Sequence, residues 1–254
     1  MPLLSVLTTS YNREEYLAEA IESVLASSFT DFEYIIVDDG STENILAIAK
    51  YYEKVDSRIK VYVNEKNLGD YPNRNKAAGY AKGKYIKYLD TDDIMYRHCL
   101  EVMMYSMEKY PEAGFGLSAK GDEKEPYPVC ISPREIYIEH FGDYGHFNRA
   151  PGSAIIKRQA FEEVGGFSGA RYTGDIELWF TLAQKYSMVK FPLDLYWARS
   201  HNNQEKVMEK KTNKPETRKA LIKKFLESPY CPIDAQEIKL SFGRKIKQSI
   251  GRII

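Results

Sequence analysis

Apolar and polar residues follow two different periods along the first ninety residues. Short runs of branched and aromatic side chains bounded by polar turns predict strands, and apolar residues three or four apart predict helices. The resulting order, βαβαβαβ, is typical of parallel strands joined by right-handed crossovers, with helices on both faces of the sheet. Asn12 and Glu15 have the spacing of a capping box for the first helix. The predicted strands cover residues 3–9, 33–37, 59–63 and 85–89, and the helices carry apolar faces at 17–25, 45–52 and 74–81.

The pattern between residues 95 and 204 is less regular. Residues 141–151 mix glycine, histidine, asparagine and aromatic side chains, which is typical of an active-site loop and also of other surface loops. We expect residues 195–201 to return to the sheet as a last strand. The other predicted elements are a helix around 100–107, an irregular stretch at 112–133, a strand at 153–156, a helix at 158–164 and a helix that begins near residue 175.

The chain after residue 204 has a different composition. Residues 205–214 are dominated by charge and are interpreted as a solvated link, and Pro215 begins a helix that extends to residue 226. The spacing of apolar and basic residues predicts a basic amphipathic helix at 241–254, which either docks on the domain or lies on an anionic membrane surface. We therefore predict one α/β domain at 1–204 and, at 205–254, the charged link and a helical C-terminal tail.

The composition of the chain mainly excludes classes of protein. The 254 residues are enough for one large α/β domain or two small ones. The 36 basic residues balance 36 acidic ones, so no overall positive field points to a nucleic acid. Cys99, Cys130 and Cys231 are far apart and form no Cys-x-x-Cys pair, which excludes a disulfide scaffold and a structural zinc site. The apolar run at Leu3 to Leu7 is too short for a signal peptide, so we expect none, and no apolar run approaches the roughly 20 residues of a membrane span. We expect a cytoplasmic protein.

Asp90, Asp92 and Asp93 follow the fourth predicted strand and form what we call the acidic turn. Three carboxylates within four residues repel one another unless a cation lies among them, and Mg²⁺ and Mn²⁺ prefer oxygen ligands. Because Mg²⁺ takes few protein carboxylates and completes its shell with water and phosphate, such a site implies a phosphorylated partner. The alternative is an ordinary solvated turn and helix cap.

The predicted topology favours the metal site. Ligands of open parallel sheets bind at the carboxyl ends of the strands. Residues 8–11 leave the first strand at that edge, and Asp38 and Asp39 leave the second, so five carboxylates converge there with the acidic turn. That much negative charge is costly unless a cation or hydrogen-bond donors compensate for it.

Asp175 is open to two interpretations from the residues alone. It lies at or near the start of the helix that carries Leu178 and Trp179, where a carboxylate stabilises the first turn by about 0.5–2 kcal/mol. The other interpretation is a catalytic carboxylate.

A series of short motifs runs in order through residues 3–201. Each motif is weak alone, and the ordered set is strong. Together they resemble the family 2 glycosyltransferases of the GT-A fold, an inverting family. The motifs are Ser5-Val6-Leu7-Thr8-Thr9-Ser10-Tyr11-Asn12, Ile21-x-Ser23-Val24-Leu25, Asp31-Phe32-Glu33-Tyr34-Ile35-Ile36-Val37-Asp38-Asp39-Gly40-Ser41-Thr42, Asn67-Leu68-Gly69, Arg74-Asn75, Ala81-x-Gly83-x-Tyr85-Ile86, Leu89-Asp90-Thr91-Asp92-Asp93, Gly152-Ser153-Ala154, Val164-Gly165-Gly166-Phe167 and Gly174-Asp175-Ile176-Glu177-Leu178-Trp179.

The resemblance implies a GT-A fold, a Rossmann-like, mainly parallel sheet flanked by helices, with a nucleotide-binding half at about 1–95 and an acceptor half at about 96–204. It implies that Mn²⁺ or Mg²⁺ supports inverting transfer of a sugar from a nucleoside-diphosphate donor, with a UDP-sugar favoured. The acceptor is expected to be a hydroxyl of a glycan or lipid-linked molecule in cell-surface polysaccharide or glycolipid synthesis. By the same resemblance, Thr9, Tyr11, Asp39, Arg74 and Asp90 bind the nucleotide, Asp92 and His201 the metal, and Asp175 is the general base.

Three positions depart from the family pattern. Gly174 precedes Asp175 where the family commonly has glutamate, Ala77 stands where glycine is usual, and Ser27 replaces a common glutamine. Gly174 therefore leaves the acceptor side without a carboxylate that the family often has there.

Two other functions stay open. A nucleotidyltransferase would also use Mg²⁺, but residues 8–12 lack the glycine and lysine of its phosphate-binding loop. A catalytically silent module that only binds sugar nucleotides is the second alternative. The inner face of the membrane is the alternative location if residues 241–254 bind lipid.

Overall fold

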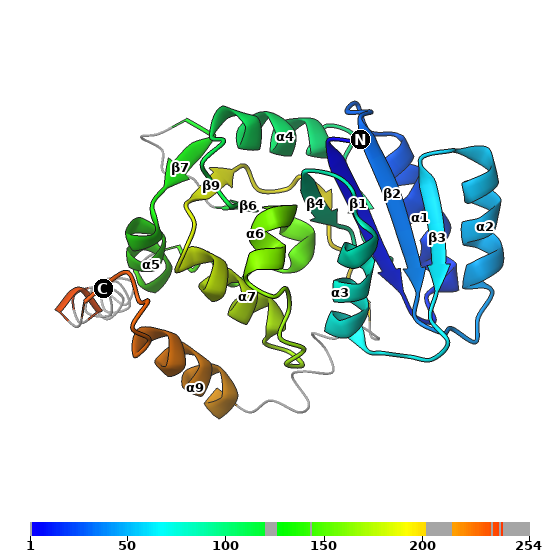
Figure 1. Cartoon of the computed structure of the whole chain (residues 1–254). Coiled ribbons are helices and arrows are strands. Elements are labelled where there is room, and N and C mark those ends of the chain that lie inside the picture. The colour runs from blue at the N-terminus through cyan, green and yellow to red at the C-terminus, as the bar shows by residue number, and fades with distance from the viewer. Residues whose placement is uncertain are drawn as a thin grey trace, which may run out of the picture.

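The computed structural model describes residues 2–119, 126–142, 144–201, 215–234, 236–238 and 240. Over these residues the chain forms a central sheet with helices on both faces (Figure 1). The strands of this sheet are β1 (Leu4–Ser10), β2 (Phe32–Asp38), β3 (Ile59–Val63), β4 (Tyr85–Tyr88), β6 (Phe115–Ser118), β7 (Val129–Ile131), β8 (Ala154–Lys157) and β9 (Met188–Phe191), in the order β3-β2-β1-β4-β8-β6-β9-β7.

The first four strands are parallel and end at one edge. β1 lies between β2 and β4, and Ser10 at the end of β1 is paired with Asp38 at the end of β2. The loops that follow β1, β2 and β4 therefore emerge side by side. β8 pairs antiparallel with both β4 and β6, which makes the sheet mixed beyond β4. The predicted βαβαβαβ order is confirmed.

Alternate residues of the strands face two separate cores, as the period of two in a strand requires. Val6 and Ile36 face the core covered by α1 (Glu14–Leu25), α2 (Ile45–Val55) and α4 (Cys99–Lys109). Leu7 and Val37 face the other core. That core is covered by α3 (Asp70–Tyr80), α5 (Pro133–Phe141), α6 (Arg158–Glu163), α7 (Gly174–Ala183) and α9 (Pro215–Leu226).

Two local predictions were wrong. The capping box fails because Asn12 adopts a positive φ of 48° and α1 begins after Arg13, with no side-chain cap. Asn12 instead accepts a hydrogen bond from the backbone N–H of Thr42 (2.9 Å), which joins the loops after β1 and β2. The last strand does not return to the main sheet, because β10 (Tyr196–Trp197) pairs with β5 (Ile94–Met95) in a separate two-stranded sheet.

Helix α9, which follows the predicted charged link, packs against α7. Phe225 is buried and stacks on Phe180 of α7, with ring centroids 4.9 Å apart, and Lys224 forms an ion pair with Glu177 (2.8 Å). Figure 1 shows α9 running beneath α7 toward α5. The link at 205–214 and the helix predicted at 241–254 lie outside the described residues. Among the described residues no helix has both the length and the apolar content needed to span a membrane.

Candidate active site

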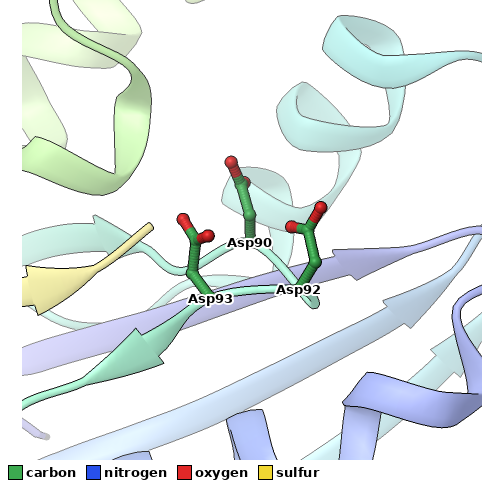
Figure 2. A group of neighbouring side chains, drawn as sticks. All are labelled: Asp90, Asp92 and Asp93. Carbon is green, nitrogen blue, oxygen red and sulfur yellow. The ribbon is translucent and has the colours of Figure 1, made fainter. Parts of the chain in front are cut away.

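The acidic turn follows β4 at the edge where the parallel strands end. Figure 2 shows the side chains of Asp90, Asp92 and Asp93 directed to the same side of the turn. One ligand oxygen from each lies within 4.8 Å of the others. The turn is anchored to β1, because Thr91 donates its hydroxyl to the carbonyl of Thr9 (2.9 Å). The sequence therefore concentrates three carboxylates in a fixed arrangement.

Asp92 is paired with His201, which the 195–201 segment brings back over the acidic turn. The His201 Nε2 atom lies 2.7 Å from a carboxylate oxygen of Asp92, and the imidazole ring packs against Tyr16 of α1. Two residues earlier, the backbone N–H of Arg199 donates to Asp93 (3.1 Å) and its Nε donates to the carbonyl of Asp92 (3.0 Å). The segment thus holds Asp92 and Asp93, the C-terminal end of the turn.

The donor set of the acidic turn fits a hard divalent cation. Burial raises the pKa of Asp93 well above its ordinary value, and the charges of Asp90 and Asp92 raise it further. Carboxylate oxygens and one imidazole nitrogen on a partly exposed turn are ligands that Mn²⁺ and Mg²⁺ accept. A cation bound there would relieve the repulsion that is reflected in the raised pKa.

Arg74 connects the acidic turn to helix α3. Its buried guanidinium lies 2.8 Å from Asp90 and 2.7 Å from Asp70, and it packs over the ring of Tyr88. Burial alone would lower the pKa of Arg74, but the two carboxylates outweigh burial and raise it. Arg74 is therefore a permanent positive charge beside the turn.

Asp39 organises the loop that leads into α3. One carboxylate oxygen accepts hydrogen bonds from the Asn64 side chain (2.7 Å) and the Leu68 N–H (2.9 Å), and the other accepts from the Gly69 N–H (3.0 Å). Gly69 has a φ of 87°, a backbone conformation that favours glycine. A recess of about 360 Å³, lined in part by Asn64 and Leu68, lies beside this loop.

The five carboxylates expected at this edge divide into two groups. Hydrogen-bond donors satisfy Asp38 and Asp39, with Ser41 donating to Asp38. The other three form the acidic turn. Tyr11 lies at the same edge with 45% of its surface exposed, and so it is available to a ligand.

Asp175 occupies the first turn of α7 and is half-buried. Burial raises its pKa from 3.8 to about 6, against a backbone hydrogen bond from Ile176 (2.7 Å) and the positive charge of Arg74. The charge of Asp70 raises it slightly. Because Arg74 acts on both Asp175 and Asp90, α7 and the acidic turn face the same region. A half-buried carboxylate with a pKa near neutrality can accept a proton.

The family follows from comparison with known proteins. The model for "Glycosyl transferase family 2" matches residues 5–165, which is more than half of the chain. The chain belongs to this family. Two solved structures are similar along nearly its whole length. S. aureus TarS with UDP-GlcNAc has a TM-score of 0.72 at 17% identity and covers 96% of this chain and 71% of its own. The mannosyltransferase PcManGT from Pyrobaculum calidifontis, with GDP-Man and Mn²⁺, has a TM-score of 0.63 at 15% identity. The match covers 97% of this chain and 75% of PcManGT.

Three proteins with similar sequences are named as glycosyltransferases. The putative teichuronic acid biosynthesis glycosyltransferase TuaG of Bacillus subtilis is 41% identical over 47% of this chain and 49% of its own. Glycosyltransferase GlyG of Streptococcus pneumoniae is 29% identical over 78% of this chain and 71% of its own. The GalNAc(5)-diNAcBac-PP-undecaprenol beta-1,3-glucosyltransferase of Campylobacter jejuni is 28% identical over 74% of this chain and 62% of its own. The aligned region thus spans only about half of TuaG. The predicted family and GT-A fold are confirmed.

Three residues of this family 2 domain escaped the sequence analysis. Lys87 is fully buried in β4 and donates to the carbonyl groups of Tyr88 (2.6 Å) and Gly152. A lysine inside an otherwise apolar strand is the signal that could have identified it. Arg199, two residues before His201, and Tyr71, three residues before Arg74, carried no comparable signal, because their partners are distant in sequence.

Proposed function

We propose that the protein is a metal-dependent, inverting glycosyltransferase that moves a sugar from a nucleoside-diphosphate donor to a hydroxyl acceptor. One observation carries the proposal: Arg74 acts electrostatically on both the acidic turn and Asp175, a half-buried carboxylate whose pKa is about 6. A diphosphate and a base must lie on opposite sides of the reacting carbon. The arrangement provides a candidate group for each side.

The donor would bind at the edge where the parallel strands end. Asp92 and His201, with Asp90 beside them, would hold Mn²⁺ or Mg²⁺, and the ion when bound neutralises negative charge on the leaving diphosphate. Thr9, Tyr11 and Asp39 would contact the base or ribose beside the recess at Asn64. Asp90 would contact the ribose, and Arg74 would face the phosphates.

A UDP-sugar is the favoured donor. The similar TarS structure contains UDP-GlcNAc, whereas the similar PcManGT structure contains GDP-Man and Mn²⁺. The TM-score is higher for TarS. The donor base is therefore the first specificity to measure.

Asp175 would act on the acceptor. Its carboxylate takes the proton of the attacking hydroxyl while the acceptor oxygen bonds to the anomeric carbon and the bond to the diphosphate oxygen breaks. Attack from the face opposite the leaving group inverts the anomeric configuration. A pKa of about 6 keeps the base mostly ionised at neutral pH without making it too weak to accept a proton.

The acceptor would be a glycan or a lipid-linked glycan used in cell-surface polysaccharide or glycolipid synthesis. The names of the B. subtilis and C. jejuni relatives, which refer to teichuronic acid and to a PP-undecaprenol acceptor, support this class. We place the protein in the cytoplasm, with the inner membrane face as the site of a lipid-linked acceptor.

Calorimetric titration tests the donor site. UDP, GDP, dTDP and CDP are each added with and without Mn²⁺ to the wild type, to Asp92→Ala and to Asp31→Ala, whose exposed carboxylate precedes β2 at the opposite edge. We expect Mn²⁺-dependent binding of UDP that Asp92→Ala loses and Asp31→Ala retains. Absence of binding to all four nucleotides would contradict the proposal. Release of pyrophosphate from a donor, in place of nucleoside diphosphate, would instead identify a nucleotidyltransferase.

A further inference from the structure

Tyr71 of α3 packs directly on the backbone where α7 begins. A Cβ atom built at Gly174 would lie 2.7–2.9 Å from three ring atoms of Tyr71, which is too close for any side chain. The φ of Gly174 is not in the left-handed region, so the ring and not the backbone conformation requires glycine. Tyr71 is itself held in place, because it is 7% exposed and stacks on Phe167 with ring centroids 5.0 Å apart.

The hydroxyl of Tyr71 also interacts with Asp175. Burial raises the pKa of Tyr71, the negative charges of Asp175 and Asp70 raise it further, and a hydrogen bond with the Asp175 backbone opposes the rise. Tyr71 thus contacts the residue before the carboxylate and the backbone of the carboxylate residue.

Helix α3 is anchored firmly enough to serve as a reference for α7. Arg74 forms an ion pair with Asp90. The Asn75 side chain makes two hydrogen bonds with the backbone of Phe167, accepting from its N–H (2.9 Å) and donating to its carbonyl (2.8 Å). A shift of α7 relative to α3 would move Asp175 relative to the acidic turn.

We propose that Tyr71 is the positioning residue for Asp175, with its ring filling the space above Gly174 and its hydroxyl holding the backbone at the start of α7. This inference rests on the proposed function, in which Asp175 is the base. Tyr71 itself touches no reacting atom. Gly174 and Tyr71 form one unit, in which the absent side chain of the first makes room for the ring of the second.

A double-mutant cycle tests this coupling. The variants are Tyr71→Ala, Gly174→Ala and the double variant, with Gly79→Ala as control because a Cβ at Gly79 in α3 meets nothing within 4 Å. The assay measures UDP release with Mn²⁺ from whichever of UDP-glucose, UDP-GlcNAc and UDP-galactose the wild type hydrolyses fastest. Thermal unfolding verifies that each variant is folded.

We expect Gly174→Ala to lower kcat at least about tenfold in the wild type, because small displacements of a catalytic group are costly. In the Tyr71→Ala background the same change should cost less than about twofold, since the colliding ring is gone. Gly79→Ala should match the wild type. Equal losses from Gly174→Ala in both backgrounds would overturn the inference.

The pH profile separates positioning from simple loss of stability. Tyr71→Ala admits water to Asp175, so the acidic limb of the rate profile, which we expect near pH 6 in the wild type, should move to lower pH. A purely structural role would lower the rate at every pH without moving this limb, and an unmoved limb would count against the proposal. Tyr71→Phe keeps the ring and loses one hydrogen bond, so we expect about a fivefold lower kcat.

Nucleotide binding distinguishes failure of this inference from failure of the proposed function. UDP binding with Mn²⁺ should be within about twofold of the wild type in all five variants, because none alters the acidic turn. A wild type that neither binds UDP with Mn²⁺ nor releases it from a donor overturns the proposed function and this inference with it. An active wild type without coupling between Tyr71 and Gly174 overturns this inference alone.

Discussion

Asp175→Asn separates catalysis from folding stability. The amide keeps the shape of the carboxylate, and its oxygen can still accept the hydrogen bond from Ile176 (2.7 Å). It cannot take a proton, so we expect kcat to fall by about 10² to 10⁴. UDP binding should be unchanged, because Asp175 lies on α7 and not on the acidic turn.

The same change should stabilise the fold at neutral pH. At about 1.4 kcal/mol per pKa unit, a rise from 3.8 to about 6 makes the ionised Asp175 cost about 3 kcal/mol in the folded state. This cost is absent below pH 3.8, where the carboxyl is protonated in both states, and it develops as the pH rises to 6. Asp175→Asn avoids it, so its advantage in free energy of unfolding should be about 3 kcal/mol at pH 8 and about half of that at pH 5.

Urea denaturation at pH 5 and pH 8, together with UDP release from a UDP-sugar, measures both effects. Glu177→Gln is the matched control on the same helix, where Lys224 (2.8 Å) and Ser168 hold the carboxylate and lower its pKa despite burial. Glu177→Gln should keep most of the activity. It should be less stable than the wild type at pH values where Glu177 is ionised, whereas Asp175→Asn should be inactive and more stable. If Asp175→Asn kept near wild-type turnover while Glu177→Gln abolished it, Glu177 would be the base and the reasoning would be refuted.

Two further substitutions test buried cations. Arg74→Met leaves Asp70 and Asp90 without their shared partner. We expect urea denaturation to show a free energy of unfolding lower by about 2–3 kcal/mol, a loss limited by the partial exposure of both carboxylates. Unchanged stability and UDP binding would contradict the role given to Arg74. Lys87→Met leaves two buried carbonyl groups unpaired, one of them that of Gly152, and should cost about 1–3 kcal/mol in the same assay. A gain in stability would show that the cost of burying the ammonium dominates.

Local periodicity was enough to predict the sheet edge that carries the candidate site. The strand at residues 59–63 and the helix at 215–226 have the predicted bounds, because apolar spacing and proline are local signals. The parallel order of the first strands then brought residues 9–11, 38–39 and 90–93 to one edge. These contacts follow from topology and need no knowledge of side-chain geometry.

Contacts between distant residues could not be predicted in this way. Asn12 has the spacing of a cap, but a hydrogen bond from Thr42, thirty residues later, holds it in the left-handed region. Tyr71 and Gly174 are about a hundred residues apart, and only the packing of α3 on α7 joins them. The departure at Gly174 was visible in the sequence, and the ring that explains it was not.

The stereochemistry of donor hydrolysis tests the central claim most directly. An α-linked UDP-sugar that the protein turns over is followed by proton NMR from the first minutes, before the released sugar mutarotates, beside Asp175→Asn. The account predicts that the β-anomer appears first in the wild type and that the variant releases sugar at least about a hundredfold more slowly. First appearance of the α-anomer, or equal rates in the two proteins, would contradict it.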